Sequence, residues 1–415
     1  MTRFVAKRVQ FKSGERHSVL SRVGELPVHE AVLFLARFRT TGRRPNTIHR
    51  ICDTLALLYR WLDGSGIDLL SRLRRGQFLT APEIHRLVDI AQYRADDASE
   101  EANGEEQQKQ VVNLKSVRVR RKKQELSLQP VDVASHATRL RYFTLYFEFL
   151  VGYYAATLSR PLKAQLESDS KGVLAILRAQ VPKVPTKRGT RQGMTETDQA
   201  LLLEVIRPGS PANPWKRPFV QYRNWLIVVL LLASGMRRGE LLNVRLNDLS
   251  PNAPILRIVR RLHAADDRRL IQPTPKTRER DIELRPAIMK AVWGYIAMRR
   301  EIPAARKHAY LIVGDDGAEL AYKNVDRIFA DIRRACPELP IDLSSHVMRH
   351  TWNDRFSEQA ELMGLSEVAE QRARNEQQGW AEDSKSAATY TRRYATKKGR
   401  EISLRLQEEL DVSDE

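Results

Sequence analysis

Hydrophobic side chains recur with a helical period along most of the chain from Val28 onward. The clearest case is the segment PNTIHRICDTLALLYRWL (45–62), whose apolar positions fall on one face of a helix: Ile48, Ile51, Leu55, Leu58 and Leu62. Asn46 stands where an N-terminal cap is expected. A second amphipathic helix is predicted over SHATRLRYFTLYFEFL (135–150), with Ser135 as its cap.

The second half of the chain mixes helical patterns with short β-like runs. Thr195 and Asp198 have capping-box spacing, and an apolar helix is predicted from Phe219 to Ser234. Strands are predicted near 255–260, 269–274 and 280–284. Helical patterns return at 286–300 and 324–336, in the region containing SSHVMRHTWNDRF, and in a final amphipathic piece at 399–410.

These elements predict a mainly α protein with a small antiparallel sheet and two domains. Residues 1–27 are interpreted as a basic, irregular arm, and 28–180 as a helical domain with a polar insert at 96–134. Residues 181–194 contain prolines, glycines and cations without an apolar period, so they predict a linker. Residues 195–415 form the second, α+β domain.

Charge narrows the class of partner. The chain has 415 residues and a formal net charge of +19. A chain this basic typically faces a polyanion, most often nucleic acid, although a ribosomal or membrane-surface role fits the charge too. Its most apolar stretch, from Trp225 to Ala233, is too short to span a bilayer, and the N-terminus has no apolar leader, so a cytoplasmic, nucleoid-associated protein is expected.

Cysteine usage predicts neither a disulfide framework nor a zinc site. Cys52 and Cys336 are far apart and lack nearby metal-ligand partners, so both are expected to pack as small apolar side chains.

Basic residues on the predicted helices and loops are candidates for contacts with the DNA backbone. These residues are Arg50, Arg60, Arg139 and Arg141 on the two helices, Arg120, Arg121 and Lys122 in the run KSVRVRRKK, and Lys187 and Arg188 in the linker. For the basic run, a solvated loop remains an equal alternative.

Four segments in the second half carry side chains suited to phosphate chemistry. Arg237 lies in SGMRRGELL, where Glu240 is placed to fix its guanidinium. His346 and Arg349 are three residues apart in HVMRHT, so they share one helix face. Two arginines can clamp a phosphate with paired hydrogen bonds. His350 has the spacing of a metal ligand beside His346, but no third ligand accompanies the pair, so no metal or other cofactor is expected.

The remaining chemistry is a lysine and a phenol. Lys276 lies in PTPKTRERDIEL between two predicted strands, where a lysine can reach a leaving oxygen. Tyr390 and Tyr394 lie four residues apart on one predicted helix face, and either could be a nucleophile. Arg238 and Arg278 are the neighbouring cations that compete with the assigned ones.

These motifs, in this order, resemble those of the tyrosine recombinases, also called the phage integrase family. The resemblance covers roughly residues 190–400 and implies that Tyr390 is the nucleophile and Lys276 the general acid. It also implies that Arg237, Arg349 and His346 bind the phosphate, and that Trp380 occupies the position of a usual histidine. Two features depart from the family pattern: the interval from Trp380 to Tyr390 is one residue longer, and the stretch from Arg349 to Trp380 is long and polar.

The family implies a covalent 3′-phosphotyrosine, strand rejoining without ATP, and a C-shaped clamp on double-stranded DNA. Two protomers would bind one site and four would form the synapse, with partner recombinases as a further option. The last helix would dock on a neighbouring protomer or pack on its own chain. A site-specific recombinase of a mobile element is therefore predicted. A type IB topoisomerase and a DNA-binding regulator without cleavage activity are the alternatives.

Overall fold

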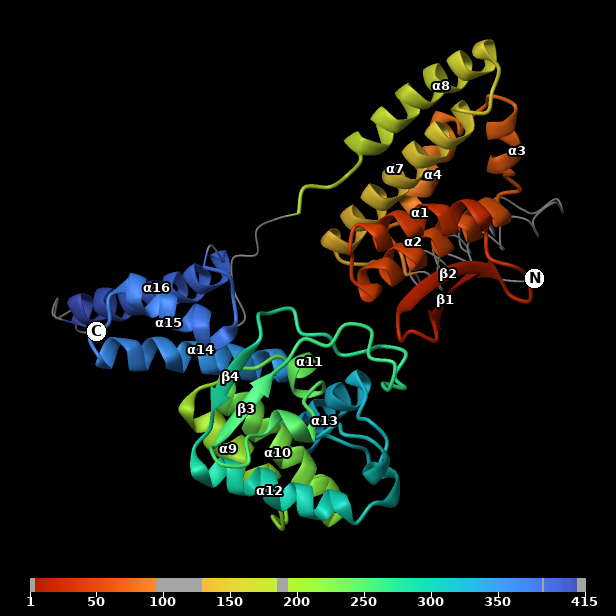
Figure 1. Cartoon of the computed structure of the whole chain (residues 1–415). Coiled ribbons are helices and arrows are strands. Elements are labelled where there is room, and N and C mark those ends of the chain that lie inside the picture. The colour runs from red at the N-terminus through yellow and green to blue at the C-terminus, as the bar shows by residue number, and fades with distance from the viewer. Residues whose placement is uncertain (1–3, 95–128, 185–192, 383, 409–415) are drawn as a thin grey trace, which may run out of the picture. The chain divides into compact units, whose positions relative to one another are not determined.

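The computed structural model describes residues 4–94, 129–184, 193–382 and 384–408 of the chain. The chain divides into two units with the main boundary between Thr186 and Lys187. This boundary lies inside the segment predicted to be the linker. Both units are mainly helical and each contains one two-stranded antiparallel sheet, which confirms the predicted fold class (Figure 1).

The first unit begins with a β-hairpin. Strand β1 (Phe4–Gln10) pairs antiparallel with β2 (Arg16–Arg22), with Phe4 opposite Arg22 and Gln10 opposite Arg16. The hairpin packs on helix α2, and Leu20 is fully buried. The prediction of an irregular arm over residues 1–27 is therefore wrong for these strands. Strand β1 has no apolar–polar alternation, because Lys7 and Arg8 are adjacent and each face of the strand carries one of them, so the segment resembles a basic arm.

Helices enclose one apolar core in this unit. They are α1 (His29–Thr40), α2 (Pro45–Gly64), α3 (Leu69–Arg74), α4 (Ala81–Ile90), α7 (Val133–Ala155) and α8 (Arg160–Ala179). The predicted apolar stripes of α2 and α7 are buried in this core, and Leu55, Phe143 and Phe147 have no exposed surface. Helices α7 and α8 pack against each other along their lengths (Figure 1).

Both predicted helix caps of the first unit are wrong. The cap of α2 is Arg44, and Pro45 occupies the first turn, where its missing N–H costs nothing. Asn46 lies inside the helix and accepts a hydrogen bond of 3.0 Å from Arg8 Nη1. Helix α7 is capped by Asp132, whose carboxylate accepts the Ser135 N–H at 3.0 Å.

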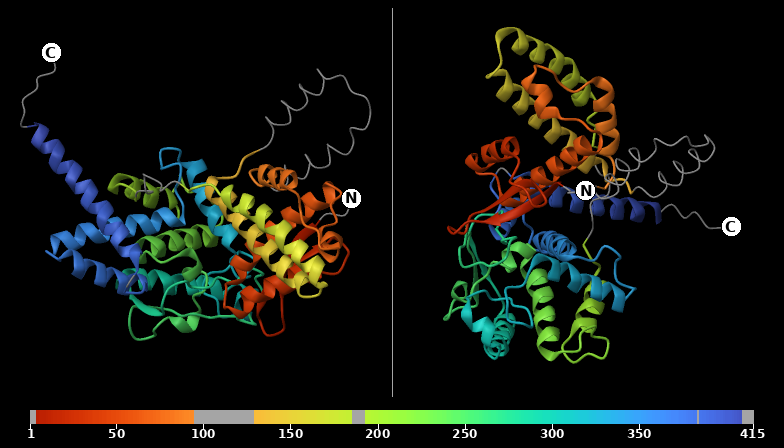
Figure 2. Two further views of the ribbon diagram at one scale, coloured as in Figure 1. Left: turned by 90° about the horizontal axis from the view of Figure 1, so that it is seen from above. Right: turned by 90° about the vertical axis from the view of Figure 1, so that its right-hand side faces the viewer.

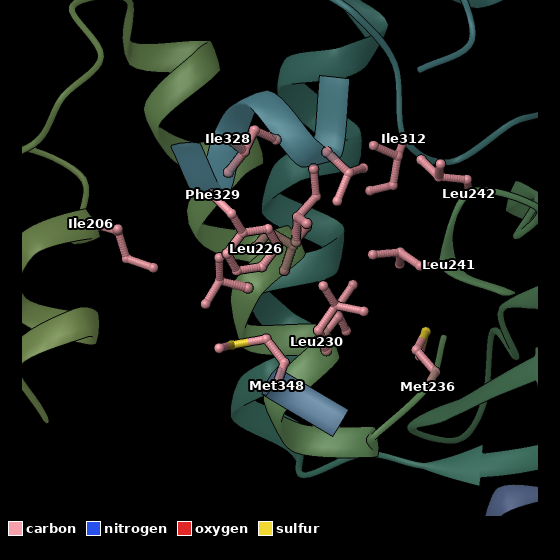
Figure 3. Packing of buried hydrophobic residues seen from close by; sticks show 14 of the residues in the cluster. Ile206, Leu226, Leu230, Met236, Leu241, Leu242, Ile312, Ile328, Phe329 and Met348 are labelled. Carbon is pink, nitrogen blue, oxygen red and sulfur yellow. The ribbon is translucent and has the colours of Figure 1, made fainter. Parts of the chain in front are cut away.

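The second unit is built around the apolar helix α10 (Pro218–Ser234). Leu226 and Leu230 of α10 contact side chains of the surrounding elements, among them Phe329 and Met348 (Figure 3). The surrounding helices are α9 (Glu196–Ile206), α12 (Pro286–Arg300), α13 (Tyr322–Ala335) and α14 (Ser345–Leu362). Thr195 and Asp198 form the predicted capping box at the start of α9.

The sheet of the second unit is small. Strand β3 (Ile255–Ile258) pairs antiparallel with β4 (Arg280–Glu283), with Ile255 opposite Glu283. The strand predicted near 269–274 does not form. There, Arg269 is buried, pairs with the fully buried Asp267 at 2.9 Å, and lies 4.5 Å from the ring centre of Tyr310. This ion pair fixes the connection between the strands without a ladder.

Three helices complete the second unit: α14, α15 (Glu367–Gln378) and α16 (Lys385–Glu408). Helix α15 forms within the long polar stretch between Arg349 and Trp380. The predicted amphipathic piece at 399–410 is not a separate element, because its described residues, 399–408, belong to α16. The end of α16 extends beyond the other two helices, and Ile402, Leu404 and Leu406 are exposed (Figure 2).

In the described part of the chain, no helix is both long enough and apolar enough to cross a bilayer. Cys52 and Cys336 are buried free cysteines, as predicted.

Candidate active site

The turn after α10 places Arg237. The apolar helix ends at Ser234, and Gly235 adopts a left-handed conformation with φ of 60° that redirects the chain. Arg237 then caps the short helix α11 (Arg238–Leu241). Its backbone N–H donates to Glu240 Oε2 at 3.1 Å, and its Nη1 donates to Glu240 Oε1 at 3.3 Å. The predicted support of Arg237 by Glu240 is thus present in the geometry.

Glu240 is the centre of a larger cluster. Its side chain is fully buried and accepts hydrogen bonds of 2.8 Å from Thr277 Oγ1 and from Arg280 Nη2. Burial alone would raise the pKa of Glu240, but the guanidinium of Arg280 and the charges of Arg349 and Arg237 outweigh it and lower that pKa. Glu240 is therefore ionised, and it gathers three arginines around one carboxylate.

The segment before β4 is tied to the turn after α15. The Arg278 N–H donates to the Gly379 carbonyl at 2.8 Å, and Arg280 Nε donates to the Gln377 carbonyl at 2.8 Å. Arg278 Nη2 also donates to the Trp380 carbonyl at 2.5 Å. Lys276 lies next to this anchored backbone, on the β3–β4 connection rather than in a tight hairpin turn, and its side chain is exposed.

Arg349 approaches the same cluster from α14. Only 2% of its surface is exposed, and its Nη1 donates to the Gly235 carbonyl at 2.6 Å. Burial, followed by the charge of Arg237, lowers the pKa of the Arg349 guanidinium to about 9, so it remains charged at neutral pH. Its Nη2 is buried and has no hydrogen-bond partner among the described residues. A buried donor left open in this way is free to bind the oxygen of a water molecule or of a substrate.

Trp380 and Tyr390 continue the site from Arg349. The Arg349 Cζ lies 5.0 Å from the centre of the Trp380 ring. The rings of Trp380 and Tyr390 are nearly parallel, with an interplanar angle of 8° and centroids 5.9 Å apart. Trp380 is buried, and its Nε1 is a second donor without a partner in the described structure. The extra residue between Trp380 and Tyr390 does not prevent this stacking.

Two histidines of α14 lie beside the same tyrosine. The His350 ring centroid is 5.6 Å from that of Tyr390, and the His346 ring lies 4.6 Å from that of His350. His346 is exposed, whereas His350 is half-buried. Within the described residues, no three His, Cys, Asp or Glu side chains gather as a metal site would require.

Tyr394 has different surroundings from Tyr390, although both lie on α16. Its hydroxyl donates to Glu361 Oε2, and Lys398 Nζ pairs with the same carboxylate at 3.0 Å. Burial, and then the hydrogen bond to Glu361, raise the pKa of Tyr394. This environment disfavours the phenolate form that a nucleophile requires.

The structure thus gathers Arg237, Glu240, Arg349, Trp380 and Tyr390, with His346 next to them through His350. Sequence reasoning missed Arg280, Thr277 and Arg374, and it considered His350 only as a metal ligand. Strand alternation could have revealed Arg280, because it shares a face of β4 with the buried Ile282.

The basic residues predicted to contact DNA differ in exposure and in hydrogen bonding. Arg50 and Arg141 are exposed on α2 and α7. Arg60 is half-buried, and its Nε donates to the Ala56 carbonyl at 3.0 Å. Arg139 Nη1 donates to the carbonyls of Ala91 and Tyr93 at 2.8 and 2.5 Å, so this guanidinium is engaged inside the unit. Arg120, Arg121, Lys122, Lys187 and Arg188 lie outside the described residues.

A protein-family model matches the part of the chain that contains this candidate site. Residues 216–396, which include every side chain of the cluster described above, match the phage integrase family. The chain carries a phage integrase family domain. Tyrosine recombinase is the other name of this family, so the resemblance recognised in the sequence motifs is confirmed.

The solved structures similar to this chain include one recombinase and two integrases. XerA recombinase is 16% identical with a TM-score of 0.35, covering 87% of this chain and 92% of its own. A lambda integrase dimer bound to a COC′ core site is 14% identical with a TM-score of 0.47, covering 88% and 95%. The Tn1549 transposon integrase in complex with transposon right end DNA is 17% identical with a TM-score of 0.39, covering 74% and 98%. Among curated proteins, none matches the chain.

Proposed function

We propose that this chain is a site-specific DNA recombinase of a mobile element, which cuts and rejoins strands through a covalent 3′-phosphotyrosine. One observation carries the proposal: two buried donors, Arg349 Nη2 and Trp380 Nε1, lack partners in the described structure, beside the ring of Tyr390. A phosphodiester offers the oxygen acceptors that both donors need, and it offers a phosphorus atom for a phenol to attack.

The arginine cluster would stabilise the transition state. Arg237 donates a hydrogen bond to the buried Glu240, and Arg349 donates one to the Gly235 carbonyl, so both guanidinium groups are held in place before substrate arrives. Preorganised cations stabilise the charge that develops on a pentavalent phosphate without reorganising during the reaction. Glu240 therefore acts as a positioning residue for the clamp.

The protein and the DNA supply every atom and proton that the transfer step requires. The Tyr390 oxygen forms a bond to phosphorus while the bond from phosphorus to the 5′ oxygen breaks. Lys276 donates a proton to the leaving 5′ oxygen, and His346 or His350 accepts the proton of the phenol. The phosphotyrosine keeps the bond energy, so attack by a 5′ hydroxyl reverses the step without a nucleotide cofactor.

Both units would contribute contacts to the DNA. The exposed Arg50 and Arg141 of the first unit are the described candidates for backbone contacts. Two protomers would bind one site and four would form the synapse. The exposed apolar side chains at the end of α16 would serve protomer contacts.

Covalent trapping tests the proposal. The full chain is incubated with a pool of labelled duplexes that have random core sequences and a nick, so that cleavage releases a short strand and cannot reverse. We expect a denaturant-resistant protein–DNA adduct for the native protein and for Tyr394→Phe, and none for Tyr390→Phe. Sequencing the trapped DNA then gives the target.

Two outcomes would contradict the proposal. DNA binding without any adduct would make the protein a regulator that lacks cleavage activity. Relaxation of a supercoiled plasmid that lacks the selected site, without strand exchange between selected sites, would make it a topoisomerase.

A further inference from the structure

Helix α15 places a second buried guanidinium, after that of Arg349, beside the proposed nucleophile Tyr390. Arg374 has no exposed surface, and its Cζ lies 5.7 Å from the centre of the Tyr390 ring and 5.1 Å from that of Phe356. It lies in the long polar stretch between Arg349 and Trp380, which departs from the family pattern. The phosphate-binding residues described above do not include it.

Two polar partners fix the position of Arg374. Its Nη2 donates to Ser357 Oγ at 2.6 Å and to Glu370 Oε1, one turn earlier on α15. Ser357 Oγ in turn donates to Glu370 Oε1 at 2.7 Å. The guanidinium is therefore held by groups from α14 and α15, while the tyrosine belongs to α16.

Helices α14 and α15, which pack against α16, bring several charged and titratable groups to Tyr390. From α14 these are Arg349, which interacts electrostatically with Tyr390, and His350, with His346 beyond it. From α15 they are Arg374 and its partner Glu370. Glu370 is the acidic member of this set, and its carboxylate accepts hydrogen bonds from Arg374 and Ser357.

Burying an arginine is costly, because desolvation of a guanidinium is repaid only in part by one carboxylate. A core position needs no charge, so an apolar side chain would fill this space at lower cost. A cation near an aromatic ring is attracted to it, and the attraction increases when the ring carries negative charge. The cost is explained if the charge acts on Tyr390 during the reaction.

We propose that Arg374 is a positioning residue that orients the ring of Tyr390 and favours its phenolate form during attack on DNA. The inference rests on the proposed function, since it assigns a helper to the same nucleophile. At 5.7 Å, a full charge in a medium of effective dielectric about 20 is equivalent to roughly two pH units. Removing Arg374 alone should therefore shift the pH profile by about two units, or up to roughly a hundredfold in rate at neutral pH, whereas removing Glu370 as well should cancel part of this shift.

The test is the pH dependence of single-turnover cleavage. The substrate is the selected DNA with sulfur in place of the bridging 5′ oxygen, so that protonation of the leaving group does not limit the rate. Arg374→Met should move the rising limb of the profile upward by about two pH units, and its rate should approach the native rate at high pH. Arg374→Lys keeps the charge and should stay within about threefold of the native rate.

Substitutions of Glu370 should move the rising limb of the pH profile in the opposite direction, so the variants are expected to follow a fixed order along the pH axis. Glu370→Gln removes the offsetting charge and should move the limb to lower pH. The double variant Glu370→Gln/Arg374→Met buries no unpaired charge, so it replaces Arg374→Met if that variant does not fold. The rising limb of its pH profile should lie between the limbs of the native protein and of Arg374→Met. Arg372→Met changes an exposed arginine on the same helix and should leave the profile in place.

A rate reduced equally at every pH, or limbs that do not follow this order, would make Arg374 a structural residue only. That result is distinct from failure of the proposed function, in which the native protein itself forms no adduct.

Discussion

Replacing Glu240 by glutamine tests how the candidate active site is held together. The substitution keeps the shape of the side chain and removes its charge. The carboxylate is fully buried, and it pairs with Arg280 at 2.8 Å and with Arg237 at 3.3 Å. After the change, Arg280 and Arg349 remain almost completely buried with no carboxylate between them.

The expected cost follows from this geometry. Removing one partner of a buried ion pair leaves an uncompensated charge in a poorly hydrated place, which typically costs about 3–5 kcal/mol. Glutamine can still accept one hydrogen bond through its carbonyl, so the lower half of that range is expected. The matched control is Glu204→Gln, since Glu204 and Arg207 form an exposed pair at 2.8 Å that is worth about 0–1 kcal/mol.

The pH dependence has a definite sign. Because the pKa of Glu240 is lowered in the folded protein, its contribution is present above the unfolded value of about 4.3. The contribution disappears as the pH falls through the folded pKa. The difference in unfolding free energy between the native protein and Glu240→Gln should therefore be constant from about pH 6 to 8 and should shrink below about pH 4.

Urea unfolding followed by tryptophan fluorescence makes the measurement. Trp61 is the single tryptophan of the first unit, and the other five of the chain lie in the second unit, so the signal reports mainly on the unit containing Glu240. A loss below about 1 kcal/mol at pH 7, or a loss equal to that of Glu204→Gln, would refute the central role assigned to this carboxylate.

Two further substitutions, each with a control, test the turn after α15 and the apolar core around α10. Gly379→Ala should cost at least about 1 kcal/mol and reduce covalent adduct formation, because φ is 61° and a Cβ would lie 2.8 Å from the Arg278 carbonyl oxygen. Gly399→Ala, in an open part of α16, should instead stabilise the helix by about 0.5–1 kcal/mol, and thermal unfolding distinguishes the two. Leu230→Ala empties a fully buried position of α10 and should cost about 2–5 kcal/mol, whereas Leu203→Ala at a 38% exposed position should cost much less by urea unfolding.

The helices were predictable because their apolar residues recur with a strict period. The stripe from Ile48 to Leu62 needs no tertiary information, since burial of one face determines the helix. The first strands were missed for a related reason. In β1 lysine and arginine occupy the adjacent positions 7 and 8 on opposite faces, so no period-2 pattern appears and a half-buried strand has the composition of a basic arm. Segment 269–274 was predicted to be a strand and does not form one. The Asp267–Arg269 ion pair holds this segment without a strand partner.

The candidate site was predictable only where residues are close in sequence. His346 and Arg349 share a helix face by spacing alone, and Glu240 lies three residues after Arg237. Arg280 reaches Glu240 across 40 positions, and Arg374 reaches Tyr390 from another helix. No local pattern encodes such contacts. They depend on the long connection before β4, where a strand was predicted near 269–274, and on α15, which forms in a stretch that the sequence marked only as long and polar.

The excess of positive charge in the cluster links the stability of this unit to its proposed chemistry. Arg237, Arg280 and Arg349 surround one carboxylate, so the cluster carries more cationic than anionic charge before any substrate binds. A fold selected for stability alone would balance these charges or replace them with apolar side chains. The imbalance is consistent with a site that awaits an anion. Bound phosphate would then supply both the missing acceptors for Arg349 and Trp380 and the missing negative charge, so that substrate binding and stability of the second unit increase together.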